Sequence, residues 1–184
     1  MTQDISGRAL IVMGVSGVGK TTVAQALAEQ IGGRYIEADE YHPPDNIAAM
    51  AAGTPLTDTM RHPWLDALAG AMQQARTARP DTPVVVACSA LKRSYRDILR
   101  ARNPDAITVY LAADPDTIRA RITGREDHFM PPSLLDSQLE TLEPPTPDET
   151  CVTVDASLPP DISVGQIKET LLALSTNDRL TSLC

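Results

Sequence analysis

Residues 14–21 read GVSGVGKT and follow the pattern GxxxxGK[ST] of phosphate-binding loops. Glycines allow backbone N–H groups to turn toward phosphate oxygens, and the helix that begins there adds positive potential. The Lys20 ammonium is expected to reach the β- and γ-phosphates of a nucleotide, and the Thr21 hydroxyl to bind Mg²⁺. The predicted ATP contacts are Gly14, Val15, Ser16, Gly17, Val18, Gly19, Lys20 and Thr21.

An acidic residue follows the second apolar segment, in the stretch EADEYHP at residues 37–43. Asp39 lies just past a predicted strand, and His42 follows three residues later. Three roles are open for the Asp39 carboxylate: a metal ligand, a hydrogen-bond partner of substrate hydroxyl groups, or a helix cap.

Basic residues follow the third apolar segment, in CSALKRSYRD at residues 88–97. With Ser89 as the expected N-cap, Lys92 falls in the first helical turn, where a cation opposes the helix dipole. A bound anion would offset that cost, and Arg96 lies one turn further on the same face. Solvated surface charge is the alternative.

Two further arginines, Arg121 and Arg125, lie four residues apart in the segment RARITGREDHF at residues 119–129. They precede a break in the helical pattern that carries polar and proline residues. This arrangement predicts a lid that closes over phosphates. Two exposed arginines on a helix surface are the alternative.

Strands and helices alternate along the whole chain. The predicted strands are residues 9–15, 34–39, 82–89, 106–112 and 151–156. The predicted helices are residues 21–31, 43–53, 64–78, 91–101, 114–126, 133–143 and 162–174, with a polar loop at 54–63. This order predicts an α/β protein with a five-stranded parallel sheet between two helical layers. We expect one domain over residues 1–184, with its core at 9–174, a lid at 121–135 and a frayed tail at 175–184.

Composition narrows the function classes. A net charge of −8 argues against a nucleic-acid binder, and 3% aromatic residues argue against a base-stacking surface. The apolar run at the N-terminus is too short for a membrane helix. Cys88, Cys151 and Cys184 form no CxxC pair, which predicts reduced thiols and a cytoplasmic protein.

A phosphate-binding loop does not define the reaction, because switches, motors and kinases share it. A short chain with five predicted strands has no room for extra modules and favours a kinase. Ser89 also ends the third strand where hydrolytic ATPases usually carry an acid. Thr21, phosphates and water would then hold the magnesium.

The chain resembles the P-loop gluconate-kinase family from about residue 9 to 174. The resemblance rests on MGVSGVGKT, DEYHPPDNI, R.PWL at 61–65, CSALKRSYRD, HFM at 128–130, and the later LL.SQ..TLE.P. The phosphate-binding loop alone is common, but this set in this order is specific. It implies a three-layer α/β/α fold like that of nucleoside monophosphate kinases, with a mobile lid. It also implies transfer of the ATP γ-phosphate to the 6-hydroxyl of D-gluconate, and a homodimer.

The resemblance also implies roles for single residues. Asp39 would hydrogen-bond the attacking hydroxyl and take its proton, or contact Mg²⁺ through water. His42 would line the same pocket or hold the following loop, and Asn46 would help read hydroxyl groups. Lys20, Arg121 and Arg125 would offset charge on the phosphates, and one of the two arginines could instead stack on adenine. The candidate cations for the sugar-acid carboxylate are Arg61, Lys92 and Arg96.

Three residues depart from the family pattern: Met60 replaces an aspartate before Arg61, Ala49 replaces a lysine, and Asp127 replaces a glycine. Met60 lies in a predicted pocket-side loop, so a kinase of the same fold for another sugar acid, shikimate or a nucleotide stays open. A nucleotide-binding sensor without transfer activity is the third alternative.

Overall fold

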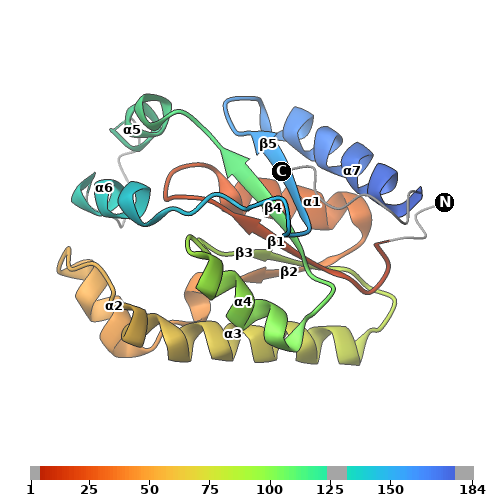
Figure 1. Ribbon diagram of the computed structural model, residues 1–184, viewed down its shortest axis with the longest axis horizontal. Coiled ribbons are helices and arrows are strands. Elements are labelled where there is room, and N and C mark those ends of the chain that lie inside the picture. Colours follow the sequence, from red (N-terminus) through yellow and green to blue (C-terminus); the bar gives the residue numbers. More distant parts are fainter. Residues whose placement is uncertain (1–4, 124–131, 177–184) are drawn as a thin grey trace.

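Five parallel strands form the central sheet of the computed structural model, which describes residues 5–123 and 132–176 (Figure 1). The strands are β1 (Ala9–Met13), β2 (Arg34–Glu37), β3 (Val84–Ala87), β4 (Ile107–Ala112) and β5 (Cys151–Asp155). Their order in the sheet is β2-β3-β1-β4-β5, and every neighbouring pair is parallel. The predicted fold class is therefore confirmed, and each strand begins and ends within two residues of its prediction.

Seven α-helices and one 3₁₀ helix are found in the described residues. They are α1 (Lys20–Ile31), η1 (Ala38–Tyr41), α2 (Pro44–Ala51), α3 (Asp58–Ala78), α4 (Arg93–Arg102), α5 (Pro115–Thr123), α6 (Pro132–Thr141) and α7 (Pro160–Thr176). Asp114 caps the N-terminus of α5, because its Oδ1 accepts hydrogen bonds from the backbone N–H groups of Asp116 and Thr117.

Alternation along β1 divides the core into two layers. Leu10 and Val12 pack with buried residues of α1 and α7, whereas Ile11 and Met13 pack with buried residues of α3 and α4. The sheet is therefore covered on both faces (Figure 1). Because all strands run the same way, the loops after β1, β2 and β3 meet at one edge of the sheet.

The start of α3 corrects a prediction. Residues 54–63 were expected to form a loop, but the helix begins at Asp58 and contains Pro63. A proline inside a helix removes one backbone hydrogen bond. The Thr57 hydroxyl offsets part of that cost as N-cap, accepting from Met60 N at 3.3 Å, and Asp58 favours the first turn electrostatically.

The start of α4 corrects a second prediction. The helix begins at Arg93 with Lys92 as its N-cap residue, so Ser89 does not cap it. Ala90 intervenes with a φ of 42°, a conformation that turns the chain between β3 and the helix.

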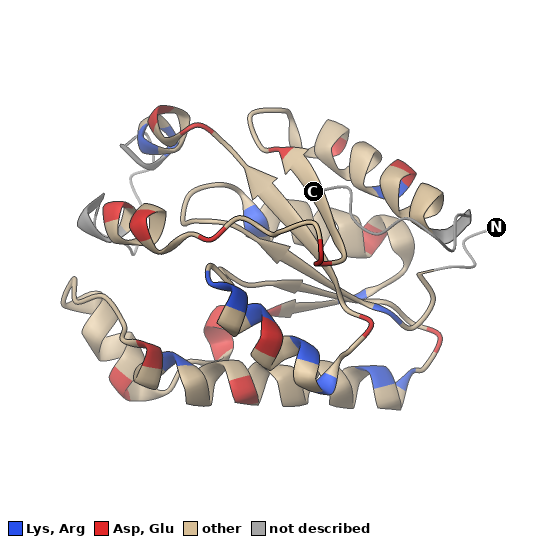
Figure 2. Cartoon of the chain, in the orientation of Figure 1, with Lys and Arg blue, Asp and Glu red and all other residues tan. Residues whose placement is uncertain are grey.

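Arg96 lies wholly inside the protein and pairs with buried Glu149. Its Nε and Nη2 each donate to one carboxylate oxygen at 2.7 Å, and Arg100 Nη1 donates to the same carboxylate at 2.8 Å. Arg96 Nη1 also donates to the backbone carbonyls of Ala90 and Glu143, both at 3.1 Å. Figure 2 shows basic positions along α4 on either side of an acidic one.

Two further observations concern the environment of the chain. Among the described cysteines, Cys88 is buried and free, whereas Cys151 is disulfide-bonded, so the prediction of reduced thiols is wrong for Cys151. No helix within residues 5–123 and 132–176 has the length and apolar character to span a membrane.

Replacement of Glu149 is expected to destabilise the fold strongly. Glu149→Gln leaves two arginines without their carboxylate, so the free energy of unfolding should fall by about 3–5 kcal/mol. Urea denaturation measures the loss. Asp66→Asn is the control, because Asp66 and Arg102 form an exposed pair, and its cost should stay below about 1 kcal/mol. Equal losses in the two variants would contradict this account.

The ion pairs of Glu149 also make the stability of the fold depend on pH in the acid range. Burial raises the pKa of Glu149, but hydrogen bonds from Arg96 and Arg100 outweigh it and lower the pKa from 4.5 to about 2. The stability that Glu149 contributes is therefore complete above pH 4.5 and lost as the pH falls toward 2. When the free energy of unfolding is measured between pH 4.5 and 2, the Glu149→Gln variant should not show this part of the loss.

Candidate active site

The loop between β1 and α1 has the backbone shape of a phosphate cradle. Gly19 precedes the first turn of α1 with a φ of 100°, which side chains rarely tolerate. A Cβ on Gly14 would lie 2.9 Å from Val18 Cγ1 and 3.0 Å from the Leu111 carbonyl oxygen, so no larger residue fits. The predicted strand–loop–helix context of the motif is therefore confirmed.

Lys20 is held at the centre of this loop. Its ammonium donates to the Val15 carbonyl at 3.0 Å. Burial lowers the pKa of Lys20, and the nearby carboxylates of Asp39 and Glu37 partly offset that effect. The phosphate-binding lysine and the acids after β2 therefore share one electrostatic environment.

Oxygen ligands for a divalent cation lie beside the loop. The Thr21 hydroxyl donates to Glu37 Oε2 at 3.0 Å, and Glu37 ends β2 two residues before Asp39. No group of three acidic, histidine or cysteine side chains forms a ready metal site in the described part of the chain. A hydroxyl with a neighbouring carboxylate fits Mg²⁺, which is usually held by one or two protein oxygens together with phosphates and water. Glu37 is a residue that sequence reasoning missed, although its place at a strand end was a usable signal.

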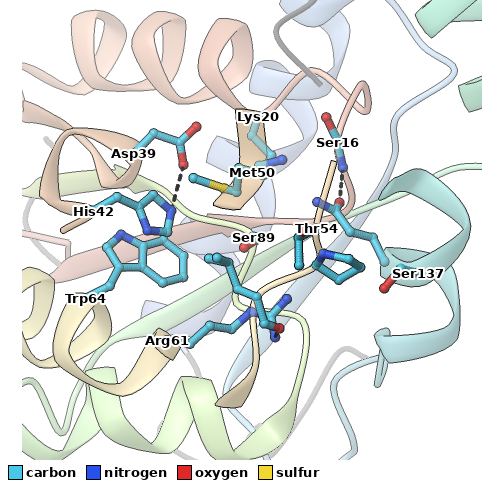
Figure 3. Close-up of a pocket in the computed structure, with 13 residues that line it drawn as sticks. Ser16, Lys20, Asp39, His42, Met50, Thr54, Arg61, Trp64, Ser89 and Ser137 are labelled. Carbon is cyan, nitrogen blue, oxygen red and sulfur yellow. Dashed lines mark hydrogen bonds and ion pairs between the residues drawn. The ribbon is translucent and has the colours of Figure 1, made fainter. Parts of the chain in front are cut away.

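A pocket opens beside Lys20 at the same edge of the sheet (Figure 3). Its lining comes from the phosphate-binding loop and the start of α1, from η1 and α2, from α3 and the segment before it, from the turn after β3, and from α6. The lining residues are Ser16, Lys20, Asp39, His42, Met50, Thr54, Pro55, Leu56, Arg61, Trp64, Ser89, Ser137 and Gln138. Three predicted acceptor-side residues, Asp39, His42 and Arg61, thus share one cavity with Lys20.

The Asp39 carboxylate faces this pocket with little restraint. Its side chain is 78% exposed, and within the described residues its recorded partner is His42 Nε2 at 3.8 Å. Helix α2 has Pro43 at its N-cap and no side-chain cap, so the helix-cap role for Asp39 is wrong. The metal and hydroxyl roles both remain compatible with its position.

Arg61 is a restrained cation in the pocket. Its guanidinium donates to the Leu56 carbonyl and, at 3.3 Å, to the Tyr95 hydroxyl. Asp58 Oδ1 lies 3.8 Å away. These contacts hold the side chain at the wall, where it is only 16% exposed.

Three predicted substrate contacts do not line this pocket and are corrected. Arg96 is buried with Glu149, as described above. Lys92 donates to both oxygens of Asp58 at 3.0 and 2.8 Å, so its charge already has a partner. Asn46 is 3% exposed and binds inside the protein instead of reading hydroxyl groups. Sequence spacing placed these residues near the pocket but could not show which partners they had.

A second hollow lies on the other side of the phosphate-binding loop. Its lining includes Gly17, Gly19, Thr22 and Arg121. Arg121 Nη1 donates to the Ala156 carbonyl at 2.7 Å, so the arginine joins α5 to the loop after β5. Arg125 and most of the predicted lid lie outside the described residues.

Comparison with known proteins agrees with this geometry. A sequence profile of the AAA domain family matches residues 10–145. A probable gluconokinase of Mus musculus is 44% identical over 169 residues, covering 82% of this chain and 91% of that protein. A gluconokinase of Gluconobacter oxydans is 42% identical over 160 residues, covering 87% and 89%. The crystal structure of a gluconokinase from Sinorhizobium meliloti has a TM-score of 0.84 and 43% identity, covering 96% of this chain and 98% of that one.

The chain belongs to the gluconokinase family. The resemblance seen in its motifs is therefore confirmed. A shikimate kinase from Aquifex aeolicus, at 13% identity and a TM-score of 0.58, shares only the fold.

Met60, which departs from the family pattern, is not part of the pocket lining. Its backbone carbonyl accepts from Asn46 Nδ2 at 3.0 Å, and its N–H is bound by Thr57. Both contacts are independent of the side chain at position 60, so the substitution leaves the local backbone arrangement intact.

Gln138 is a second residue that sequence reasoning did not assign. Its Oε1 accepts from the backbone N–H of Ser16 at 2.6 Å, which ties α6 to the phosphate-binding loop. The only signal was its place in the family motif LL.SQ.

Removal of the Arg121 side chain is expected to weaken nucleotide binding. Arg121→Ala breaks the contact between α5 and the loop after β5, so the Kd for ATP should rise about tenfold in calorimetry. Arg119→Ala is the matched control on the same helix, because Arg119 pairs with Asp116 and Asp136 in exposed positions. An unchanged Kd for Arg121→Ala would place the nucleotide elsewhere.

Proposed function

We propose that this chain is an ATP-dependent kinase that transfers the γ-phosphate to the 6-hydroxyl of D-gluconate. The observation that carries the proposal is the opening of Asp39 onto the same pocket as Lys20. Relatives that are 42–44% identical over most of their length and are called gluconokinase or probable gluconokinase support this choice of acceptor.

The phosphate side of the reaction is electrostatic. The loop N–H groups and Lys20 hold the β- and γ-phosphates, while Arg121 and Arg125 supply further positive charge. Magnesium bound at Thr21, with Glu37 nearby, would neutralise charge on the phosphates. Closure of the predicted lid at residues 121–135 would exclude water, which otherwise hydrolyses ATP.

On the acceptor side, Asp39 aligns the attacking hydroxyl and takes its proton during transfer. Its exposed carboxylate suits this task, because no protein group competes strongly for its oxygens in the described structure. Arg61 binds the carboxylate of the sugar acid, since it is the arginine in the pocket lining and its planar fork matches a carboxylate.

The family resemblance also supports a proposal for the oligomeric state, the location and the partners of the enzyme. We propose a homodimer that acts in the cytoplasm on a small-molecule acceptor, without nucleic-acid or membrane partners. The net charge of −8 supports the absence of a nucleic-acid partner.

Acceptor selectivity tests the proposal directly. ADP release is measured with Mg-ATP and D-gluconate, other sugar acids, shikimate, nucleoside monophosphates or no acceptor. Turnover selective for D-gluconate is expected. Selective turnover with another acceptor would assign a different kinase, and ATP binding by folded protein without any turnover would assign a sensor.

Loss of the Asp39 carboxylate should separate catalysis from nucleotide binding. Asp39→Ala is expected to lower kcat by about 10²–10⁴-fold while the Kd for ATP stays close to wild type. Glu40→Ala is the matched control, because Glu40 is the adjacent exposed acid on η1 and does not line the pocket. A large loss of ATP affinity in Asp39→Ala would instead indicate a metal role.

A further inference from the structure

Asn46 contacts both His42 and the first turn of α3, although Asn46 itself does not line the pocket. Its Nδ2 donates to the Met60 carbonyl at 3.0 Å and lies 3.3 Å from His42 Nδ1. Asn46 is 3% exposed, so water does not replace these partners. The amide is therefore a buried link between α3 and the loop that carries His42.

The Met60 contact fixes which way the amide faces. A backbone carbonyl can only accept, so the NH₂ group of Asn46 must lie on this side. The same Nδ2 atom faces His42 Nδ1, which must then be the unprotonated ring nitrogen. The proton of neutral His42 is consequently on Nε2, the nitrogen that lies 3.8 Å from Asp39 Oδ1.

The surroundings of His42 keep it neutral. Its side chain is 4% exposed and stacks on Trp64 with ring centroids 4.0 Å apart and planes 17° apart. Burial, with a smaller effect from the Arg61 charge, lowers the pKa of His42 to about 4. The Trp64 indole is itself held by a 2.7 Å hydrogen bond to the Ala38 carbonyl.

We propose that Asn46 and His42 are positioning residues that orient the Asp39 carboxylate through a fixed Nε2–H tautomer of His42 (Figure 3). The present 3.8 Å separation exceeds a direct hydrogen bond, and catalytic contacts of this kind commonly shorten when substrate binds. His42 then donates to one oxygen of Asp39 and leaves the other oxygen for the acceptor hydroxyl. This role in orienting the acceptor rests on the proposed function, whereas the tautomer follows from the protein alone.

The tautomer is measured by NMR on the full chain with ¹⁵N-labelled histidine at neutral pH. The signals of His42 are assigned by their absence in His42→Gln, since the chain has three histidines. We expect an unprotonated Nδ1 and a protonated Nε2. A protonated Nδ1, or a charged ring at neutral pH, would overturn the proposal.

Asn46→Asp tests the link from the amide to the carboxylate. A carboxylate at this position only accepts, so Nδ1 of His42 should become protonated. Because the new carboxylate also favours the charged ring, the comparison is made at a pH where NMR shows His42 to be neutral, with its Nε2 lone pair turned toward Asp39. The tautomer should reverse in NMR, and kcat should fall about ten- to a hundredfold, the effect of losing one hydrogen bond to a charged group, with the Kd for ATP unchanged. Asn103→Asp is the control, because Asn103 is likewise buried and its amide donates to the backbone carbonyls of Ala69 and Leu99 instead of to a residue of the pocket. That variant should lose stability without moving the His42 signals.

A second pair of variants covers the case in which Asn46→Asp does not fold. His42→Gln keeps an N–H donor that can reach Asp39, whereas His42→Leu removes it. The kcat of His42→Gln should therefore be closer to wild type than the kcat of His42→Leu. Equal kcat in these two variants, or wild-type kcat in Asn46→Asp, would overturn the positioning role. If D-gluconate is not the acceptor, the NMR result still decides the tautomer, and the kcat comparison is made with the acceptor found in the panel.

Discussion

A charged guanidinium inside a protein core needs hydrogen-bond partners and a counter-charge. At Arg96 this requirement holds together three segments that are distant in the sequence. The carboxylate of Glu149 neutralises the guanidinium, and the backbone carbonyls of Ala90 and Glu143 accept from its Nη1. As a result the turn after β3 and the segment between α6 and β5 are held against the start of α4. That turn carries Ser89 into the pocket, and the other segment leads back to the helix that contacts the phosphate-binding loop.

The two sides of the site use charge differently. On the phosphate side, a lysine in a buried loop and a helix N-terminus concentrate positive potential. On the acceptor side, the exposed carboxylate of Asp39 sits beside a neutral imidazole, and Arg61 is anchored on the opposite wall by an aromatic hydroxyl and a carbonyl. The sheet brings both sides together because parallel strands end at a common edge.

The sequence was sufficient for the fold class and for the five strands, since apolar runs and helical periodicity are local properties. It also located the phosphate-binding loop, Asp39, His42 and Arg61, because these follow strand ends or short motifs. It failed for Arg96 and Lys92, whose partners lie 53 and 34 residues away in the chain. Local spacing suggested a common anion for the two cations, but pairing partners distant in sequence cannot be inferred from helical spacing.

The early start of α3 was missed for a related reason. Pro63 reads locally as a helix breaker, while the cap and the ion pair that stabilise the first turn involve Thr57 and the distant Lys92. The contact between Asn46 and the Met60 carbonyl depends on that first turn, so a chain read with a loop there would not have suggested it.

Trp64 gives the molecule an optical property. It is the only tryptophan in the chain, and its indole ring forms part of the pocket wall in direct contact with His42. The emission of an indole depends on its immediate surroundings, so all tryptophan fluorescence of the protein originates beside the pocket that Lys20 and Asp39 share. The occupancy of that site can therefore be followed in unmodified protein, without a label and independently of turnover.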